Sequence, residues 1–375
     1  MENNNDFKGL LVYVTSNTDY DDVTITSITN KSPHILDYVI LDIKSDKPEA
    51  SEVLRVAKSI YAHRSNARFW IGTRKCDMYT NWNTLDSSTI INELNVIKNT
   101  FLSDAVGKTI WNNCVKGIYL NMESIYHTIN YDVGPDQNNG KSFAIAKNLS
   151  NYVHNSMGLK FLWIPYYGYG SNAAEVIKKI AYVVARTNMF DIVILQPHYY
   201  FDASVSANLK GVKYSIDKNN IYYRDNVEVF NRTCHSATVG FEMEVGDLAY
   251  AEQGSRERYE SYVETFKGCT NVPMCYYAGN MEEAGRNYPL IGLFFGVIYG
   301  DADGNGYLTA NDSSIVLQYA LDGSAPDNIL MVGDVDGNGV LSANDSSLIL
   351  QKTIQPSFEF PIIQKIYDEN ARDEQ

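Results

Sequence analysis

The sequence predicts a (β/α)8 barrel of the TIM type, an α/β fold, followed by a small all-α module. Over residues 8–298, short β-rich runs alternate with amphipathic stretches of helical length. Near the C-terminus, an acidic loop pattern occurs twice, 33 residues apart. The charge also divides the chain. From Gly300 onward there are 13 acidic and 3 basic residues, so 10 of the 14 net negative charges lie in this last part.

The barrel prediction depends on eight candidate strands. They span 9–15, 36–43, 68–73, 116–122, 160–166, 191–197, 238–245 and 272–278. The clearest helical stretches between them span 49–64, 87–102, 172–188 and 255–268. Eight βα units in about 290 residues are typical of a closed barrel. A doubly wound open sheet is the alternative, but no glycine-rich phosphate loop follows the first strand.

The ends of the chain and its composition add further expectations. We expect residues 1–7 to be a disordered segment and residues 364–375 to be a tail. The acidic balance argues against nucleic acid as a partner. No apolar run is long enough to span a membrane, and residues 1–5 do not form a signal peptide. Five cysteines without metal-ligand spacing predict mostly buried thiols, with one disulfide possible.

The two acidic loops have the pattern of calcium sites. Oxygen-bearing residues occupy positions 1, 3, 5, 9 and 12, a glycine holds position 6, and position 7 offers a backbone carbonyl. The expected ligands are Asp301, Asp303, Asn305, Tyr307, Thr309 and Asp312, then Asp334, Asp336, Asn338, Val340, Ser342 and Asp345. Two bound Ca²⁺ ions are therefore expected. Ordinary solvated turns are the alternative, which the recurrence disfavours.

Each loop leads into one helix, and this loop-plus-helix duplication over 299–363, closing with FEFPI, resembles the dockerin module. The resemblance implies calcium-dependent binding to a cohesin module of a scaffoldin. It also implies a secreted, extracellular protein of a cellulosome, from which an export signal has been removed. The alternative is a calcium site that only stabilises the C-terminus.

The dockerin resemblance also implies which residues contact cohesin. These are Ala310, Asn311, Leu317, Gln318, Ala343, Asn344, Leu350 and Gln351. The two copies agree at these positions, so either copy could face the partner after a half-turn of the module.

Polar and aromatic residues gather where the predicted strands end, which is where barrel active sites lie. The candidates are Asp42, Arg74, Asn121, Glu123, Trp163, Tyr166, Tyr167, Gln196, His198, Tyr199, Glu242, Glu244 and Tyr277. Glu242 and Glu244 share one face of their strand. Burying an unpaired carboxylate is costly, so acids repeated on an inward face are expected to have either a functional role or a partner that offsets the cost. The alternative is that these faces point outward, or that the acids pair with buried Arg or Lys.

Carboxylates on the fourth and seventh strands, with Asn121 two residues before Glu123, resemble the clan of retaining (β/α)8 glycosidases. The resemblance implies that Glu123 is the acid/base and Glu244 the nucleophile. Glu242 is the second choice, or the neighbour whose charge raises a partner's pKa. The segments WIPYYGYG, FDIVILQPHYYF and GFEMEV also resemble a bacterial barrel domain of unknown function, which implies no substrate.

The remaining strand-end residues fit the binding of a sugar chain. Rings that could stack on sugar faces are Trp163, Tyr166, Tyr167, Tyr199 and Tyr277, and side chains that could bind hydroxyls are Asp42, Arg74, Asn121, Gln196 and His198. We therefore expect a cellulosome-associated glycoside hydrolase acting on plant or microbial polysaccharide. A non-catalytic sugar-binding barrel is the first alternative. A protease or esterase is disfavoured because neither a Gly-x-Ser-x-Gly nor a His-Glu-x-x-His motif is present.

Overall fold

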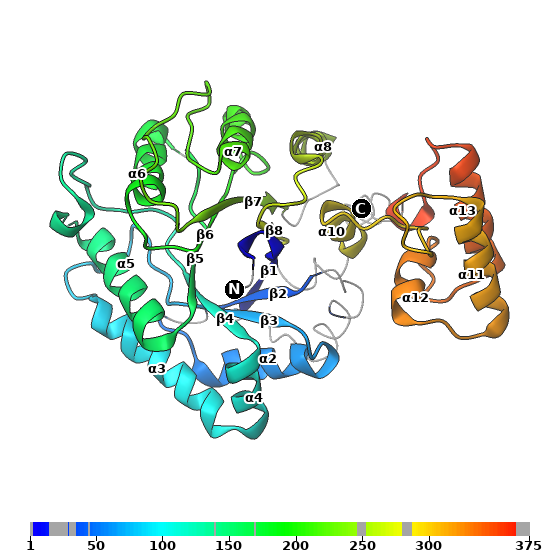
Figure 1. Cartoon of the computed structure of the whole chain (residues 1–375), viewed down its shortest axis with the longest axis horizontal. Coiled ribbons are helices and arrows are strands. Elements are labelled where there is room, and N and C mark those ends of the chain that lie inside the picture. The colour runs from blue at the N-terminus through cyan, green and yellow to red at the C-terminus, as the bar shows by residue number, and fades with distance from the viewer. Residues whose placement is uncertain are drawn as a thin grey trace, which may run out of the picture.

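Eight parallel strands close into a barrel in the order of the sequence in the computed structural model of the chain (Figure 1). The structure describes residues 3–14, 29, 35–43, 46–138, 140–168, 170–245, 253–279 and 287–364. The strands are β1 Lys8–Val14, β2 Asp37–Asp42, β3 Arg68–Gly72, β4 Val115–Leu120, β5 Lys160–Trp163, β6 Ile192–Leu195, β7 Thr238–Glu244 and β8 Met274–Tyr277. Because β1 pairs with both β2 and β8, the barrel prediction is confirmed and the open-sheet alternative is wrong.

Helices surround the barrel (Figure 1). They are α2 Ala50–His63, α3 Ser87–Ser103, α4 Ala105–Asn113, α5 Lys141–Tyr152, α6 Ala173–Arg186, α7 Ala207–Lys218, α8 Gln253–Phe266 and α10 Tyr288–Phe294. Short turns of helix occur at Asn4–Asp6, Pro135–Gln137, Val153–Met157 and Ala203–Val205. Local chemistry fixes several starts. Asp86 and Asp104, for example, accept hydrogen bonds from backbone amides in the first turns of α3 and α4.

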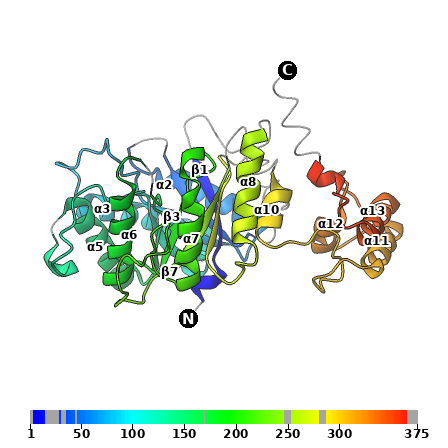
Figure 2. The same ribbon diagram turned by 90° about the horizontal axis from the view of Figure 1, so that it is seen from above.

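Three further helices follow the barrel: α11 Ala310–Asp322, α12 Asp327–Gly333 and α13 Ala343–Ile354. In both views α10 lies between the barrel and these C-terminal helices (Figures 1 and 2). α10 belongs to the packing of the barrel, since Phe294 makes edge contacts with Phe241 of β7 and Tyr276 of β8. No helix among the described residues is both long enough and apolar enough to cross a membrane.

The barrel axis is filled by alternate residues of the strands. Leu11, Val39, Leu41, Leu162 and Ile194 belong to this inner cluster, while their neighbours in sequence pack against the helices. At the start of the strands, Trp70 of β3 fills the floor and passes close to Gly117 of β4. A Cβ at residue 117 would lie 2.2 Å from the Trp70 ring.

Residues 3–7 are ordered, so the expectation of a disordered segment is wrong for them. Phe7 is buried against Trp70, with ring centroids 5.3 Å apart. The Asn4 amide donates to the Asp191 carbonyl at 3.0 Å and accepts from Lys160 Nζ at 2.8 Å. The segment closes the open end of the barrel, where apolar floor residues would otherwise meet water. Residues 1 and 2, and the predicted tail from residue 365, lie outside the described residues.

All five cysteines are free thiols, and Cys76, Cys114 and Cys275 are buried. The expectation of mostly buried thiols is confirmed, and the disulfide that the sequence left possible is not formed.

The close approach of Trp70 to Gly117 generates a test of the barrel floor. We expect Gly117→Ala to destabilise the barrel by about 1–3 kcal/mol, because an added methyl group in a filled core forces neighbours off their preferred positions. Denaturant unfolding monitored by tryptophan fluorescence measures this change. Gly134→Ala is the matched control, because φ there is −66° and no atom lies within 4 Å of the added Cβ. Equal stability of the two variants would contradict the packing argument.

Candidate functional site

A cavity of about 330 Å³ opens at the carboxyl ends of the strands. It gathers seven of the strand-end residues that the sequence singled out: Glu123, Tyr166, Gln196, His198, Glu242, Glu244 and Tyr277. They come from the ends of β4 to β8, so five consecutive strands contribute to one pocket. This is the position that barrel enzymes use for catalysis.

Strand β7 brings two carboxyl groups to the pocket. Glu242 and Glu244 both line the pocket. Phe241, which precedes Glu242, and Met243, which lies between the two glutamates, pack instead in the outer cluster against the helices. Both glutamates are only 2% exposed. The alternation of the strand therefore places both acids on the inward face, and the outward-facing alternative is wrong.

Glu242 is a buried acid that lines the pocket. Its Oε2 has no hydrogen-bond partner among the described residues. Burial raises the pKa of Glu242 well above its ordinary value, and the charges of Glu244 and Glu123 raise it further. Glu242 therefore holds its proton to a higher pH than an exposed glutamate does, and in its protonated form it can donate as well as accept a hydrogen bond.

Glu244 has a different set of partners. Its Oε2 accepts a hydrogen bond from the hydroxyl of Tyr262, which reaches in from α8. Its Oε1 lies 3.8 Å from His198 Nδ1. His198 follows Pro197 and has φ of 60°, a left-handed backbone that is uncommon outside glycine. The turn directs the imidazole toward the Glu244 carboxyl and against the Tyr166 ring, 5.1 Å between centroids.

Glu123 follows β4, which is three strands away from β7 in the closed barrel. Burial raises its pKa, and the effect outweighs the nearby Lys75 ammonium and the hydrogen bond from Tyr166, both of which favour the ionised form. Tyr166 makes two hydrogen bonds to Glu123. One joins the two side chains, and in the other the Tyr166 backbone N–H donates to the Glu123 backbone carbonyl at 3.0 Å. Glu123 thus combines a fixed position with a raised proton affinity, which suits a general acid.

Several residues of the site were not singled out from the sequence, among them Tyr13, Lys75, Phe201 and Tyr262. Tyr13 lines the pocket from β1, and strand alternation from Leu11 could have found it. Lys75 and Phe201 lie on loops beyond the strands. Tyr262 lies in the middle of α8, and no local pattern marks it as a partner of Glu244.

The structure does not bring Trp163 to the pocket. Its side chain points outward from β5, is fully buried, and stacks on Phe190 with centroids 5.2 Å apart. Its Nε1 donates to the Met122 carbonyl. Trp163 packs under the helices, so its predicted role as a sugar platform is wrong.

Tyr167 and Tyr199 are also outside the residues that line the pocket. Tyr167 is fully buried and donates its hydroxyl to the Tyr222 carbonyl. The Tyr199 ring stacks on Tyr262, 6.3 Å between centroids, and its N–H donates to the Tyr262 hydroxyl at 3.1 Å. Both tyrosines support the site from behind rather than facing it.

Three predicted hydroxyl-binding residues do not line the pocket, and two of them, Asp42 and Arg74, have structural partners instead. Asp42 is 1% exposed and accepts from the backbone N–H of Glu49 at 2.6 Å, ahead of α2. Arg74 forms an ion pair with Glu93 of α3 and lines a neighbouring cavity. Asn121 is buried beside the pocket, and its Nδ2 has no hydrogen-bond partner among the described residues.

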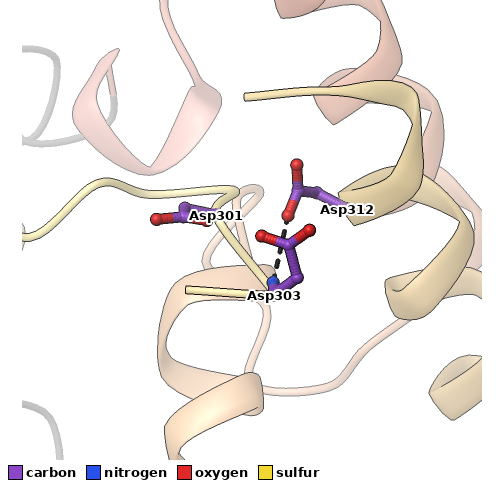
Figure 3. Close-up of side chains that lie close together, drawn as sticks. All are labelled: Asp301, Asp303 and Asp312. Carbon is purple, nitrogen blue, oxygen red and sulfur yellow. Dashed lines mark hydrogen bonds between the residues drawn. The ribbon is translucent and has the colours of Figure 1, made fainter. Parts of the chain in front are cut away.

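The C-terminal module holds two separate clusters of carboxyl groups. Figure 3 shows the first, with Asp301 and Asp303 on the loop and Asp312 on α11. In this cluster, as in Asp334, Asp336 and Asp345, carboxylate oxygens of all three residues lie within 4.8 Å of one another. The backbone orders both loops: Gly306 N–H donates to Asp301 at 2.9 Å, and Gly339 N–H donates to Asp334 at 2.8 Å.

The donor set of these clusters fits a hard divalent cation such as Ca²⁺. The atoms brought together are carboxylate oxygens, and the glycines at position 6 have φ of 89° in both loops, as a sharp turn requires. In the second cluster, burial raises the pKa of Asp334, and the charges of Asp345 and Asp336 add to the effect. Converging carboxylates of this kind are unfavourable without a cation to offset their charge.

The remaining expected calcium ligands lie outside these carboxylate clusters and have other hydrogen-bond partners or are exposed. Asn305 and Asn338 accept from backbone amides two residues on, at 2.9 Å each. The Thr309 and Ser342 hydroxyls donate to Asp312 and Asp345, which places them in the capping boxes of α11 and α13. The Tyr307 and Val340 side chains are exposed, as expected where only the backbone would serve as ligand.

All eight predicted cohesin-contact residues are exposed on the module. Two of them have an additional role. Asn311 Nδ2 donates to Asp303, and Asn344 Nδ2 donates to Asp336, at 2.8 Å in both cases. These asparagines therefore hold the acidic loops in place as well as facing solvent.

Comparison with known proteins gives only distant structural likenesses. No family model matches the chain, and no curated protein matches it. The structure is similar to a GH18 chitinase from Pseudoalteromonas aurantia, with a TM-score of 0.39, 10% identity, and coverage of 75% of this chain and 99% of that one. It is also similar to the spore cortex-lytic enzyme SleL of Bacillus megaterium, with a TM-score of 0.41, 11% identity, and coverage of 77% and 74%.

The matched structures are not all glycoside hydrolases by name. Tryptophan synthase from M. tuberculosis matches with a TM-score of 0.37, 12% identity, and coverage of 78% of this chain and 93% of that one. Several of the matched structures are glycoside hydrolases, but likenesses of this strength do not identify the reaction of this chain.

The raised pKa of Glu242 predicts a pH-dependent stability. In the unfolded chain the carboxyl ionises near 4.5, whereas in the folded chain it keeps its proton to higher pH. Folding is therefore increasingly penalised as the pH rises above about 4.5 toward the folded pKa. We expect Glu242→Gln to match the wild type at pH 4 and to be more stable at pH 7, as measured by urea unfolding. Glu264→Gln, a surface carboxyl on α8, is the control. A Glu242→Gln stability difference that is the same at both pH values would contradict the assignment.

Proposed function

We propose that the barrel is a glycoside hydrolase that cleaves a plant or microbial polysaccharide. The proposal depends on one observation: Glu123, after β4, and Glu244, at the end of β7, line the same pocket and have different environments. Glycoside cleavage needs one carboxyl group that bears a proton and a second that is ionised. Burial raises the pKa of Glu123 toward the first role, and the Tyr262 hydroxyl positions Glu244 for the second.

The reaction follows from these positions. Glu123 donates its proton to the glycosidic oxygen as the bond from that oxygen to the anomeric carbon breaks. Glu244 attacks the anomeric carbon, or takes a proton from the water that does so. Glu123, left ionised by the first step, can then accept a proton from the water that completes the cleavage when Glu244 is the nucleophile. His198 and Tyr262 hold the Glu244 carboxyl in position throughout.

The pocket also restricts the sugar that it accepts. Three carboxyl groups line it, and Lys75 is the only Lys or Arg in its described lining. A uronic acid unit would lie beside Glu244, which the reaction needs ionised, and would have one Lys to pair with its carboxylate. Tyr13, Tyr166, Phe201 and Tyr277 supply ring surface for the apolar face of a neutral sugar. A neutral polysaccharide is therefore the preferred substrate.

We further propose that the C-terminal module is a dockerin, which binds two Ca²⁺ ions and docks the chain to a cohesin of a scaffoldin. The enzyme would then act outside the cell as part of a cellulosome. The two carboxylate clusters and the exposure of the eight candidate contact residues support this proposal. Bound calcium would neutralise the converging carboxylates and fix the loops that lead into α11 and α13.

Variants of the two glutamates test the hydrolase proposal. Reducing-end release from a panel of neutral polysaccharides identifies the substrate. Glu123→Gln should then lower turnover by roughly 10²–10⁴-fold on natural substrate, and far less on aryl glycosides with good leaving groups, which need little acid assistance. Glu244→Gln should impair both substrate classes alike. A wild type that binds these polysaccharides but releases no reducing ends would make the barrel a carbohydrate-binding module instead.

Removal of the first ligand of each acidic loop tests the calcium proposal. Asp301→Ala together with Asp334→Ala should abolish the calcium-dependent rise in thermal stability of the module and its binding to cohesin, because each ion loses a carboxylate ligand. Calorimetry with calcium and with chelator measures the first effect. Asp322→Ala, an exposed acid at the end of α11, is the control. A wild-type module that keeps its fold and its affinity for cohesin in excess chelator would refute the proposal.

A further inference from the structure

A second and larger cavity adjoins the catalytic pocket. It has a volume of about 690 Å³ and lies over the loop from β3 to α3, residues 73–86. Ile43 and Lys75 line both this cavity and the pocket that holds the glutamates. The two spaces are therefore neighbours across these two side chains.

The lining of the second cavity suits a hydroxylated chain. Thr80, Asn81, Thr84 and Thr89 supply neutral hydrogen-bonding groups, and the lining also includes the charged side chains of Asp46, Arg74, Lys75 and Asp77. The Arg74 guanidinium is fixed by its ion pair with Glu93, so the wall is rigid where it meets the start of the loop. Neutral polar groups on a fixed wall bind sugar hydroxyls without demanding a charge on the ligand.

The loop that forms this cavity is ordered by its own hydrogen bonds. The Asp77 carboxylate accepts from the Tyr79 backbone N–H at 2.9 Å, and the Asp77 N–H donates to the Thr80 hydroxyl at 2.8 Å. Trp82 Nε1 donates to the Asp77 carbonyl at 3.1 Å. The Trp82 ring also packs edge-on against His127, 5.2 Å between centroids, which ties the loop to the segment after β4.

Tyr79 is the least buried large side chain of this loop. It lines the second cavity, yet its side chain is 86% exposed. Its backbone is held by Asp77, so the ring is presented from a fixed point on the rim. A rigid exposed ring beside a polar cavity has the form of a stacking platform, whose apolar face gains contact only when a ligand covers it.

We propose that this second cavity binds the continuation of the polysaccharide chain beyond the sugar held among the glutamates, with Tyr79 stacking on one of its rings. The inference rests on the proposed hydrolase function and extends it. The chain crosses from the catalytic pocket over Ile43 and Lys75 to the loop of residues 73–86. The enzyme therefore prefers long chains over short oligosaccharides.

The test uses the full-length protein and a length series of oligosaccharides of the sugar identified in the polysaccharide panel. For the wild type, kcat/KM should rise with chain length until the second cavity is filled. Tyr79→Ala should lower the ratio of kcat/KM for long chains to that for short chains by roughly three- to ten-fold, the range expected for one lost aromatic contact. Most of the change should appear in KM.

Two matched variants separate stacking from a change in the loop. Tyr79→Phe keeps the ring and should keep the length preference. Met78→Ala changes an exposed neighbour on the same loop that does not line the cavity, and it should behave as the wild type. Loss of the length preference in Met78→Ala to the same extent as in Tyr79→Ala would overturn the stacking role.

Failure of this inference can be told apart from failure of the hydrolase proposal. A wild type that cleaves the series with a kcat/KM independent of length overturns the second cavity as a subsite and leaves the hydrolase intact. A wild type that cleaves nothing overturns the hydrolase. In that case, isothermal titration with oligosaccharides of each polysaccharide in the panel decides the second cavity, because tighter binding of long chains that Tyr79→Ala removes supports it. Equal affinity for all lengths, or no binding, overturns it.

Discussion

The alternation of residues along strands that close into a barrel is the constraint on which the rest of this structure depends. Each strand sends every second side chain to the axis, so the axis is filled in layers. Phe7 and Trp70 fill the floor, and Gly117 leaves room for the indole. Layers of Leu, Ile and Val follow. What remains at the carboxyl ends is a rim that polar side chains can occupy, and there β7 contributes Glu242 and Glu244.

The three glutamates of the rim have three different environments. The pKa of Glu242 is raised, because burial and its two acidic neighbours disfavour the ionised form. Glu244 receives a hydroxyl hydrogen bond from an outer helix and has an imidazole nearby. Glu123 has an ammonium group in its surroundings and a tyrosine bound to it. Three chemically identical side chains thus acquire three different sets of partners, and carboxyl groups in different environments are what acid–base chemistry at one carbon atom requires.

Much of this arrangement could be predicted from the sequence, and each exception has a physical cause. The strands were recognisable as short apolar runs, and alternation placed Glu242 and Glu244 on one inward face. The predictions for Trp163 and Asp42 were wrong because alternation was not applied to them: both are one residue out of phase with the inward positions of their strands. Tyr262 could not be found, since only the packing of α8 on the barrel brings it to Glu244. Phe201 and Lys75 depend on loop conformations that have no periodicity.

In the C-terminal module, the two repeats meet at their own equivalent residues. The Ser313 hydroxyl donates to the Ser346 carbonyl and the Ser346 hydroxyl donates to the Ser313 carbonyl, both at 2.8 Å, where α11 packs on α13. A larger residue at either position would push both helices apart, so the two halves of the duplication are not free to diverge there independently. Asn311 and Asn344 are tied in the same way to their own loops. Retention of these residues after duplication therefore has a cause inside the module, and their likeness is by itself no measure of how many faces a partner can use.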